Sequence, residues 1–284
     1  MKKLISMLLT LTLLAGSFGC IAIRTVTKYA NADKFTAGAF TYEADKVQAI
    51  HVDWAAGGIT LTNGTGTLSV SESGGAALST SEQLHWWLDG TTLYIKYCES
   101  GYSHLIQSKD KQLSLELPEN VDLKINIASG RIKANALTVR TLNLDTASGG
   151  VEIGELYAKE TIINSASGGI GIGTAVAENT FDVDTASGGL TVSRLSAKTV
   201  KIDTASGGVT LGLDAVDTVK IDAASGKTRL KLFDTAAGAT VRLSKLSGNF
   251  DCSLPMTAEG KNYIIGNGAM QIDIDTASGG VVIE

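Results

Sequence analysis

Apolar and polar residues alternate with a period of two along most of the chain after residue 46. Before a recurring Asp or Asn, the first and third preceding residues are apolar and the residue between them is mostly polar, as in Val200, Lys201 and Ile202. A second alternating segment follows, as in Val209, Thr210 and Leu211. This period is typical of half-buried strands. The pattern therefore predicts many short β-strands.

The strands are joined by a repeated motif, in which a polar residue, two small or apolar residues and Ser-Gly follow in order. Seven copies occur, from the one that begins at Asn126 to the one that begins at Asp275. The serines of the first six copies are spaced by 19 or 20 residues: Ser129, Ser148, Ser167, Ser187, Ser206 and Ser225. Such a period indicates stacked repeats, because one coil alone buries too little apolar surface. We expect an all-β, parallel β-solenoid of about 19-residue coils, about 4.8 Å apart, preceded by an N-terminal hydrophobic helix.

Degenerate copies of the repeat extend this pattern toward both ends of the chain. The segment 50–61 has the same apolar spacing, with Trp54 in the position of the repeat threonine, and 241–252 is another copy that places Cys252 inward. Between 62 and 120 the period weakens, and Asp89-Gly90 is a hairpin turn signal. We expect a linker at 25–46, degenerate repeats and a cap at 47–120, and regular repeats at 121–284.

Composition agrees with a folded, tightly turning chain. Hydrophobic residues make up 44% and charged residues 19%, which argues against disorder. The 32 glycines against 2 prolines indicate that tight corners are made by glycine. A net charge of -5 without a basic run excludes nucleic acid as a partner.

The N-terminus has the features of a membrane-targeting segment. Lys2 and Lys3 precede an uncharged apolar stretch at 4–23, and Arg24 follows it. This stretch is long enough for a transmembrane anchor. Alternatively, Gly19-Cys20 fits a loose lipobox that would make Cys20 a lipidation site, and a cleaved signal peptide is the third interpretation. We expect residues 1–24 to tether an extracytoplasmic protein to the membrane in the cell envelope of a Gram-positive bacterium.

The corner motif resembles the Asp-Thr-Gly-Ser of aspartic proteases only superficially, because it recurs in coil after coil instead of forming one dyad. We interpret its Asp as a side chain that accepts backbone N–H bonds in an Asx-turn, and its first Gly as a residue with positive φ. The second Gly is replaced by Arg131 and Lys227, so only the first is expected to be obligatory. The predicted turn residues are Asp145, Gly149, Asp184, Gly188, Asp203, Gly207, Asp222, Gly226, Asp275 and Gly279.

Aromatic residues gather in the first third of the chain, away from the regular repeats. Trp54, Trp86, Trp87 and Tyr94 could form an exposed platform that stacks on a sugar or anchors a partner protein. The alternative is that these side chains plug one end of the solenoid.

No other motif points to chemistry. The three histidines, His51, His85 and His104, lack metal-ligand spacing, and no nucleophile constellation or phosphate loop is present. The stacked aspartates differ from calcium-binding β-rolls, since an apolar strand follows each Gly-Gly. We expect no metal, no cofactor, no disulfide framework and no catalytic residues. A β-helix enzyme acting on polysaccharide remains the alternative, because such enzymes work from carboxylates that interrupt a repeat.

The Ala-Ser-Gly-Gly corners, the segment 89–95 and the closing segment 266–283 resemble a bacterial β-strand-repeat family of unknown function whose members are labelled putative adhesins. This resemblance covers about residues 45–284 and implies a surface interaction protein with a protein or glycan partner. An envelope accessory or signalling scaffold is the alternative. Because the sequence ends on Val281–Ile283, we also expect an open edge there that could pair with another chain.

Overall fold

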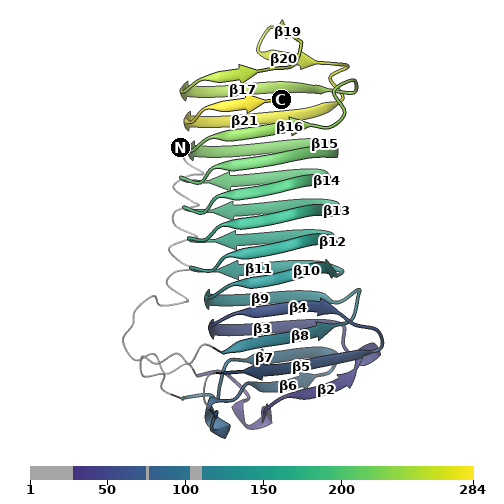
Figure 1. The fold of residues 1–284 in the computed structure, drawn as a ribbon, viewed down its shortest axis with the longest axis vertical. Coiled ribbons are helices and arrows are strands. Elements are labelled where there is room, and N and C mark those ends of the chain that lie inside the picture. The colour runs from purple at the N-terminus through teal and green to yellow at the C-terminus, as the bar shows by residue number, and fades with distance from the viewer. Residues whose placement is uncertain (1–27, 75–76, 103–110) are drawn as a thin grey trace.

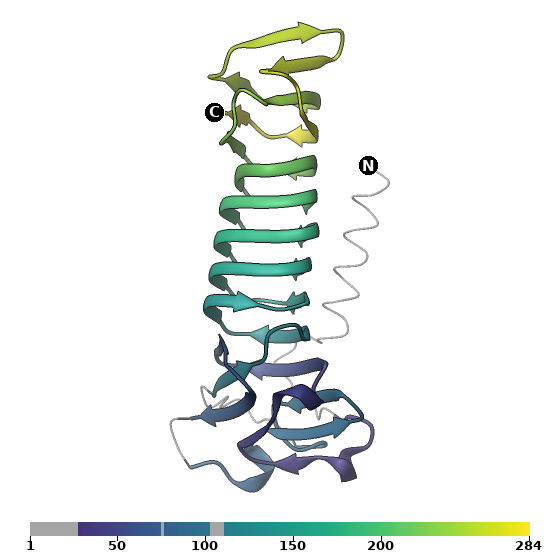
Figure 2. The ribbon, with the colours of Figure 1, turned by 90° about the vertical axis from the view of Figure 1, so that its right-hand side faces the viewer.

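The computed structural model describes residues 28–74, 77–102 and 111–284, which form one elongated stack of β-coils (Figures 1 and 2). The prediction of an all-β, solenoid-like fold is confirmed. The expected N-terminal helix and Cys20 lie outside the described residues. Within the described ranges, no helix has the length and apolar character that crossing a membrane requires.

The middle of the stack is built from the short strand β11 and from four long strands, β12 to β15, that each run through most of a coil. They pair in parallel with their neighbours. Their bounds are β11 (Thr141–Thr146), β12 (Val151–Ser165), β13 (Ile170–Thr185), β14 (Leu190–Thr204) and β15 (Val209–Ser225). The return segment that the sequence left as a third strand is continuous with these long strands.

Each coil has two sides, which are joined by the Ser-Gly corner. The first side holds β11 and the second halves of the long strands, where Val183 pairs with Ile202 and Ile202 with Ile221. The second side holds the first halves, where Ile170 pairs with Leu190 and Leu190 with Val209. The alternating apolar residues of both sides point inward and are buried in one continuous core. The register therefore places like residues in columns along the stack.

Near the N-terminal end, the order of coils in space departs from the order in the chain. β3 and β4, the first coil, lie between β7 and β8 on one side and β9 and β10 on the other. The bounds are β3 (Ala49–Ala56), β4 (Ile59–Asn63), β7 (Thr92–Lys96), β8 (Gln112–Leu117), β9 (Asp122–Ser129) and β10 (Ile132–Thr138). The predicted degenerate copy at 50–61 is thus a true coil, placed inside the stack.

At the C-terminal end, too, the order of coils in space departs from the order in the chain. β21 pairs with both β15 and β17 and lies between them in Figure 1. β22 pairs with both β16 and β18. The bounds are β16 (Thr228–Leu232), β17 (Ala239–Ser247), β18 (Phe250–Cys252), β21 (Met270–Ser278) and β22 (Val281–Ile283). The expectation of an open edge at Val281–Ile283 is therefore wrong, because a later segment of chain returns between two earlier ones. Cys252 packs against the core at an inward position, as predicted, in register with Ile283, but it is only half-buried because its coil is the last of the stack.

Antiparallel strands close the N-terminal end. β6 and β7 form the hairpin predicted at Asp89-Gly90, and Gly90 has a φ of 60°. β1 pairs with β6 and β2 with β5, so part of the expected linker belongs to the fold, because its alternating residues complete the outer strands. The bounds are β1 (Thr36–Ala37), β2 (Phe40–Glu43), β5 (Thr67–Ser73) and β6 (His85–Asp89), with short 3-10 turns η1 (Ala32–Lys34), η2 (Ala44–Lys46) and η3 (Thr80–Glu82).

A single hairpin covers part of the C-terminal end. It consists of β19 (Met256–Glu259) and β20 (Asn262–Ile265), and β20 pairs with the first residues of β17. The side chain of Tyr263 lies 4.8 Å from Phe250, centroid to centroid.

Candidate functional site

The corner glycines differ sharply in the space around them. A Cβ on Gly207 would lie 1.9 Å from the carbonyl oxygen of Gly188, whereas a Cβ on Gly208 would find no heavy atom closer than 3.7 Å. The same close approach recurs at the first Gly of the other copies, where the coil below presents a carbonyl oxygen. The first Gly is therefore required by stacking, and the second position accepts Arg131 and Lys227.

Threonine, not aspartate, accepts the corner hydrogen bond. The Oγ1 of Thr204 accepts the N–H of Gly207 at 2.9 Å, and Thr185 does the same for Gly188 at 3.0 Å. The Asx-turn interpretation is thus wrong, because register turns the threonine inward toward the corner and the aspartate outward. Positive φ is also not the general reason for glycine. Gly226 alone has a positive φ, at 124°, among the predicted corner glycines Gly149, Gly188, Gly207, Gly226 and Gly279.

The aspartates instead form an outward column, the aspartate ladder, consisting of Asp184, Asp203, Asp222 and Asp275 in register. Partial burial, and then the neighbouring carboxylate of Asp203, raise the pKa of Asp184 to about 6. Earlier in the column Asn164 relieves this repulsion by donating to Asp145 at 2.7 Å. In the described part of the chain, no group of three or more His, Cys, Asp or Glu side chains is arranged to hold a metal ion.

The four aromatic residues predicted as a binding group do not lie together. Trp54 is buried in the core in register with Ile127, which continues the threonine column. Trp86 points inward and stacks on Phe40 with ring centroids 4.0 Å apart. Trp86 thus packs against the core from the outer strand β6, as the plug interpretation expected of it, whereas Trp54 lies inside the stack between the coils of β7 and β9.

Trp87 and Tyr94 lie on the outer surface of the first side. Their rings stack at 5.8 Å, and Tyr94 contacts His51 edge to face at 5.2 Å. The residues belong to the neighbouring strands β6, β7 and β3 in register, so we call Trp87, Tyr94 and His51 the aromatic column.

A lysine and a further aromatic ring contact Trp87 at one end of the aromatic column. The Lys34 ammonium lies 4.7 Å from the Trp87 ring centroid, which allows a cation–π contact. Phe35 meets Trp87 edge on at 5.7 Å. Burial, and then the nearby charge of Lys124, lower the pKa of His51.

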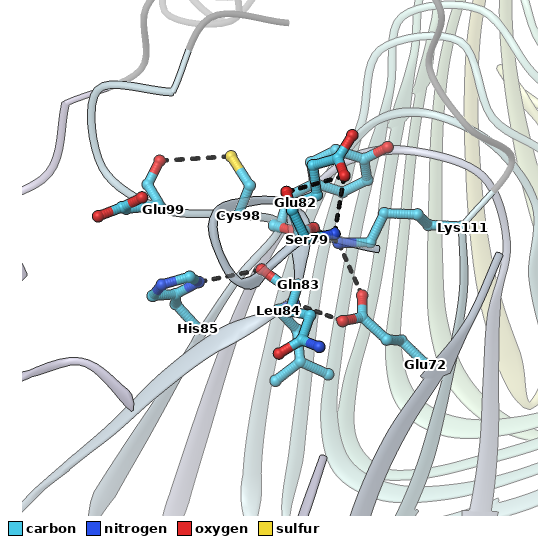
Figure 3. Close-up of polar contacts among 10 residues, drawn as sticks. Glu72, Ser79, Glu82, Gln83, Leu84, His85, Cys98, Glu99 and Lys111 are labelled. Carbon is cyan, nitrogen blue, oxygen red and sulfur yellow. Dashed lines mark hydrogen bonds and ion pairs between the residues drawn. The ribbon is translucent and has the colours of Figure 1, made fainter. Parts of the chain in front are cut away.

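A buried ion pair lies under this end of the stack (Figure 3). The Nζ atom of Lys111 lies 2.7 Å from Oε2 of Glu72, and the two side chains are 2% and 6% exposed. The ammonium also donates to the carbonyl oxygens of Glu82 and Tyr97. Glu72 in turn accepts the N–H of Leu84 at 2.6 Å.

Two aromatic rings complete the cage around Lys111. The centroids of Tyr97 and Trp54 lie 4.3 and 5.1 Å from its Nζ atom. Burial lowers the pKa of Lys111, while Glu72 opposes that change. With three acceptors around one ammonium, the group is held as a structural cation that ties β5, the η3 turn and β8 together.

Lys111 and Glu72 are not among the residues predicted above, although the sequence holds a signal for the pair. Lys111 continues the inward alternation of Leu113 and Leu115, and Glu72 continues that of Leu68 and Val70. Opposite charges at inward positions of two strands indicate a buried pair, since an isolated buried charge is too costly.

The comparisons with known proteins concern the whole stack. The family model Toastrack DUF4097 matches residues 47–284. Among solved structures, the chain is similar to a putative adhesin from Bacteroides fragilis NCTC 9343, at 15% identity and a TM-score of 0.46, covering 87% of this chain and 97% of that one. It is also similar to a putative adhesin from Parabacteroides distasonis ATCC 8503, at 14% identity and a TM-score of 0.49, covering 88% and 97%.

A putative cell adhesion protein from Clostridium sporogenes ATCC 15579 is a third neighbour, at 11% identity and a TM-score of 0.25, covering 88% and 99%. A search of curated proteins gives no match.

Proposed function

The chain belongs to the Toastrack DUF4097 family, and we propose that it is a non-catalytic, adhesin-like interaction module of the cell surface, tethered to the membrane by its N-terminal residues. The observation that carries this proposal is the aromatic column, which is half-buried, outward-facing and fixed on three paired strands. Rigid aromatic side chains with a neighbouring cation are typical of binding surfaces for sugars and proteins.

The distribution of charged groups supports a non-catalytic role. The buried pair of Lys111 and Glu72 is satisfied by its own neighbours, as described above. The aspartate ladder repeats from coil to coil and lies on an outer face. Neither arrangement places an acid and a base around a space where a substrate could react.

A matched pair of tryptophans tests the proposal. We expect Trp87→Ala to abolish binding of the purified protein to a glycan array or to membrane-fraction proteins and to cost less stability than Trp86→Ala, because Trp87 faces outward and does not pack against the core. Trp86→Ala should lower the free energy of unfolding by about 3 kcal/mol, because it removes an inward ring. Binding by Trp87→Ala equal to that of the wild type would overturn the assignment of this column.

The nature of the captured partner separates the two roles. Glycan ligands, or proteins from other cells, support the adhesin-like role. Capture of envelope proteins from the same cell instead favours an accessory scaffold. The tether is tested by expressing the full chain with Cys20→Ala, which should release the protein from membranes if lipidation holds it and leave it membrane-bound if residues 4–23 span the bilayer.

A further inference from the structure

A hollow of about 540 Å³ lies on the corner edge of the second side, where the first coil of the chain meets β10. Its floor is the backbone around Gly58, with Thr60 beside it. Register explains the shape, because the column of second corner positions runs Gln112, Gly58, Arg131 and Gly150 through neighbouring coils. Two long side chains therefore flank a residue that has none.

The walls of the hollow are cationic and polar. Arg131 and Lys133 line it together with the amide of Gln112. The Gln112 oxygen leans over the floor, since a Cβ on Gly58 would lie 2.1 Å from it. On a chain of net charge -5, this corner therefore gathers two cations beside hydrogen-bonding groups.

One carboxylate opposes these cations. Glu152 lies 3.1 Å from Arg131 and 3.8 Å from Lys133, and all three side chains are more than half exposed. Exposed pairs of this kind contribute little stability, so separating the partners costs little free energy. Arg131 and Lys133 can therefore turn from Glu152 to an anionic ligand in the hollow.

We propose that this hollow binds an acidic sugar unit, in which a carboxylate contacts Arg131 and Lys133 and ring hydroxyls meet Gln112 and Thr60. The guanidinium fork suits a bidentate carboxylate, and the volume lies in the range of small-ligand sites. The inference rests on the proposed surface role and gives it a ligand class.

The test measures the affinity of the purified protein for a galacturonate trisaccharide by calorimetry at low salt. We expect Arg131→Gln and Lys133→Gln each to weaken binding about tenfold, because each removes a charge-assisted contact. Glu152→Gln should tighten it, because it frees both cations. Lys227→Gln is the matched control, since Lys227 occupies the same corner position away from the hollow, and it should bind like the wild type.

Two results would overturn the proposal. One is the absence of trisaccharide binding by the wild type and by Glu152→Gln. The other is binding of inorganic phosphate, measured in parallel, without binding of the galacturonate trisaccharide, which would reduce the hollow to a simple anion site. Unchanged surface binding through Trp87 in either case would leave the proposed function intact, so the two failures are distinguishable.

Discussion

The middle coils and the N-terminal end of this molecule are stabilised in different ways. Between Val151 and Ser225, the coils repeat the same inward, mostly apolar columns and the same corner, in which the first glycine meets a carbonyl oxygen of the neighbouring coil. Thr185 and Thr204 each accept the N–H of that glycine, whereas Ser165 and Ala223 occupy the equivalent position in the adjacent coils. The N-terminal end repeats nothing. It uses antiparallel strands, stacked aromatic rings and one buried ion pair.

This difference teaches how a stack can be closed. A middle coil finds a copy of itself above and below, so small, uniform contacts suffice. An end coil has a neighbour on one side only, and its uncovered core requires large rings and a directed polar network. The residues that do not recur from coil to coil are therefore concentrated at the N-terminal end, and the candidate aromatic column lies among them.

The largest expected effect is a loss of stability at the N-terminal end. Lys111→Met leaves Glu72 buried without its cation, and we expect a loss of about 3–5 kcal/mol in the free energy of unfolding, measured by urea denaturation. The double variant Lys111→Met with Glu72→Leu should recover most of this loss, because an apolar pair replaces both charges. A single variant within 1 kcal/mol of the wild type, roughly the value of a surface pair, would contradict the description of the cage.

The second-largest expected effect is a loss of stability in the middle coils. Gly207→Ala should cost about 1–3 kcal/mol, because the new methyl group forces apart the coils at the Gly188 carbonyl. Gly208→Ala is the control one residue away and should change stability by about 0.5 kcal/mol or less. Equal melting temperatures for the two variants would show that coil stacking does not require the first glycine.

The smallest effect concerns the charge in the ladder. Burial raises the pKa of Asp184 to about 6, above the ordinary value of 3.8, so the folded state holds its proton more tightly than the unfolded state. Stability should consequently fall as pH rises between these two values. Asp184→Asn should stabilise the fold by about 1 kcal/mol at pH 7, after solvent screening, and by nothing below pH 3.8.

The control for this prediction is Asp217→Asn, because Asp217 is exposed and lies outside the ladder. Denaturation curves at several pH values give the comparison. A stability difference for Asp184→Asn that does not vary with pH would mean that the carboxylate charge is not its cause.

Period-two alternation and the spacing of the serines were sufficient to predict the regular coils, because each residue there meets the same residue in the next coil. They also placed Trp54 in the threonine column and Cys252 at an inward position, where the structure pairs it with Ile283. The tolerance of the second corner position could be read from Arg131 and Lys227, and the free space around Gly208 gives its physical reason.

Pairings between distant segments could not be read in this way. Nothing local in Val281–Ile283 reveals that Thr228–Leu232 and Phe250–Cys252 lie on either side of it. The sequence likewise grouped Trp86 with Trp87, although the first points inward and the second outward. Nearness in sequence does not distinguish the two until the facing strands are known.

The exchanged coil order at the C-terminal end has a consequence for the timing of synthesis. The ribosome completes β17 and β18 before it makes β21 and β22, which lie between them and the growing stack. Until residues 270–284 emerge, β15 and β16 keep an unpaired edge of the kind through which nascent chains aggregate. Translation that stops near residue 269 should therefore yield an aggregation-prone product, even though nearly all of the repeats have already been made.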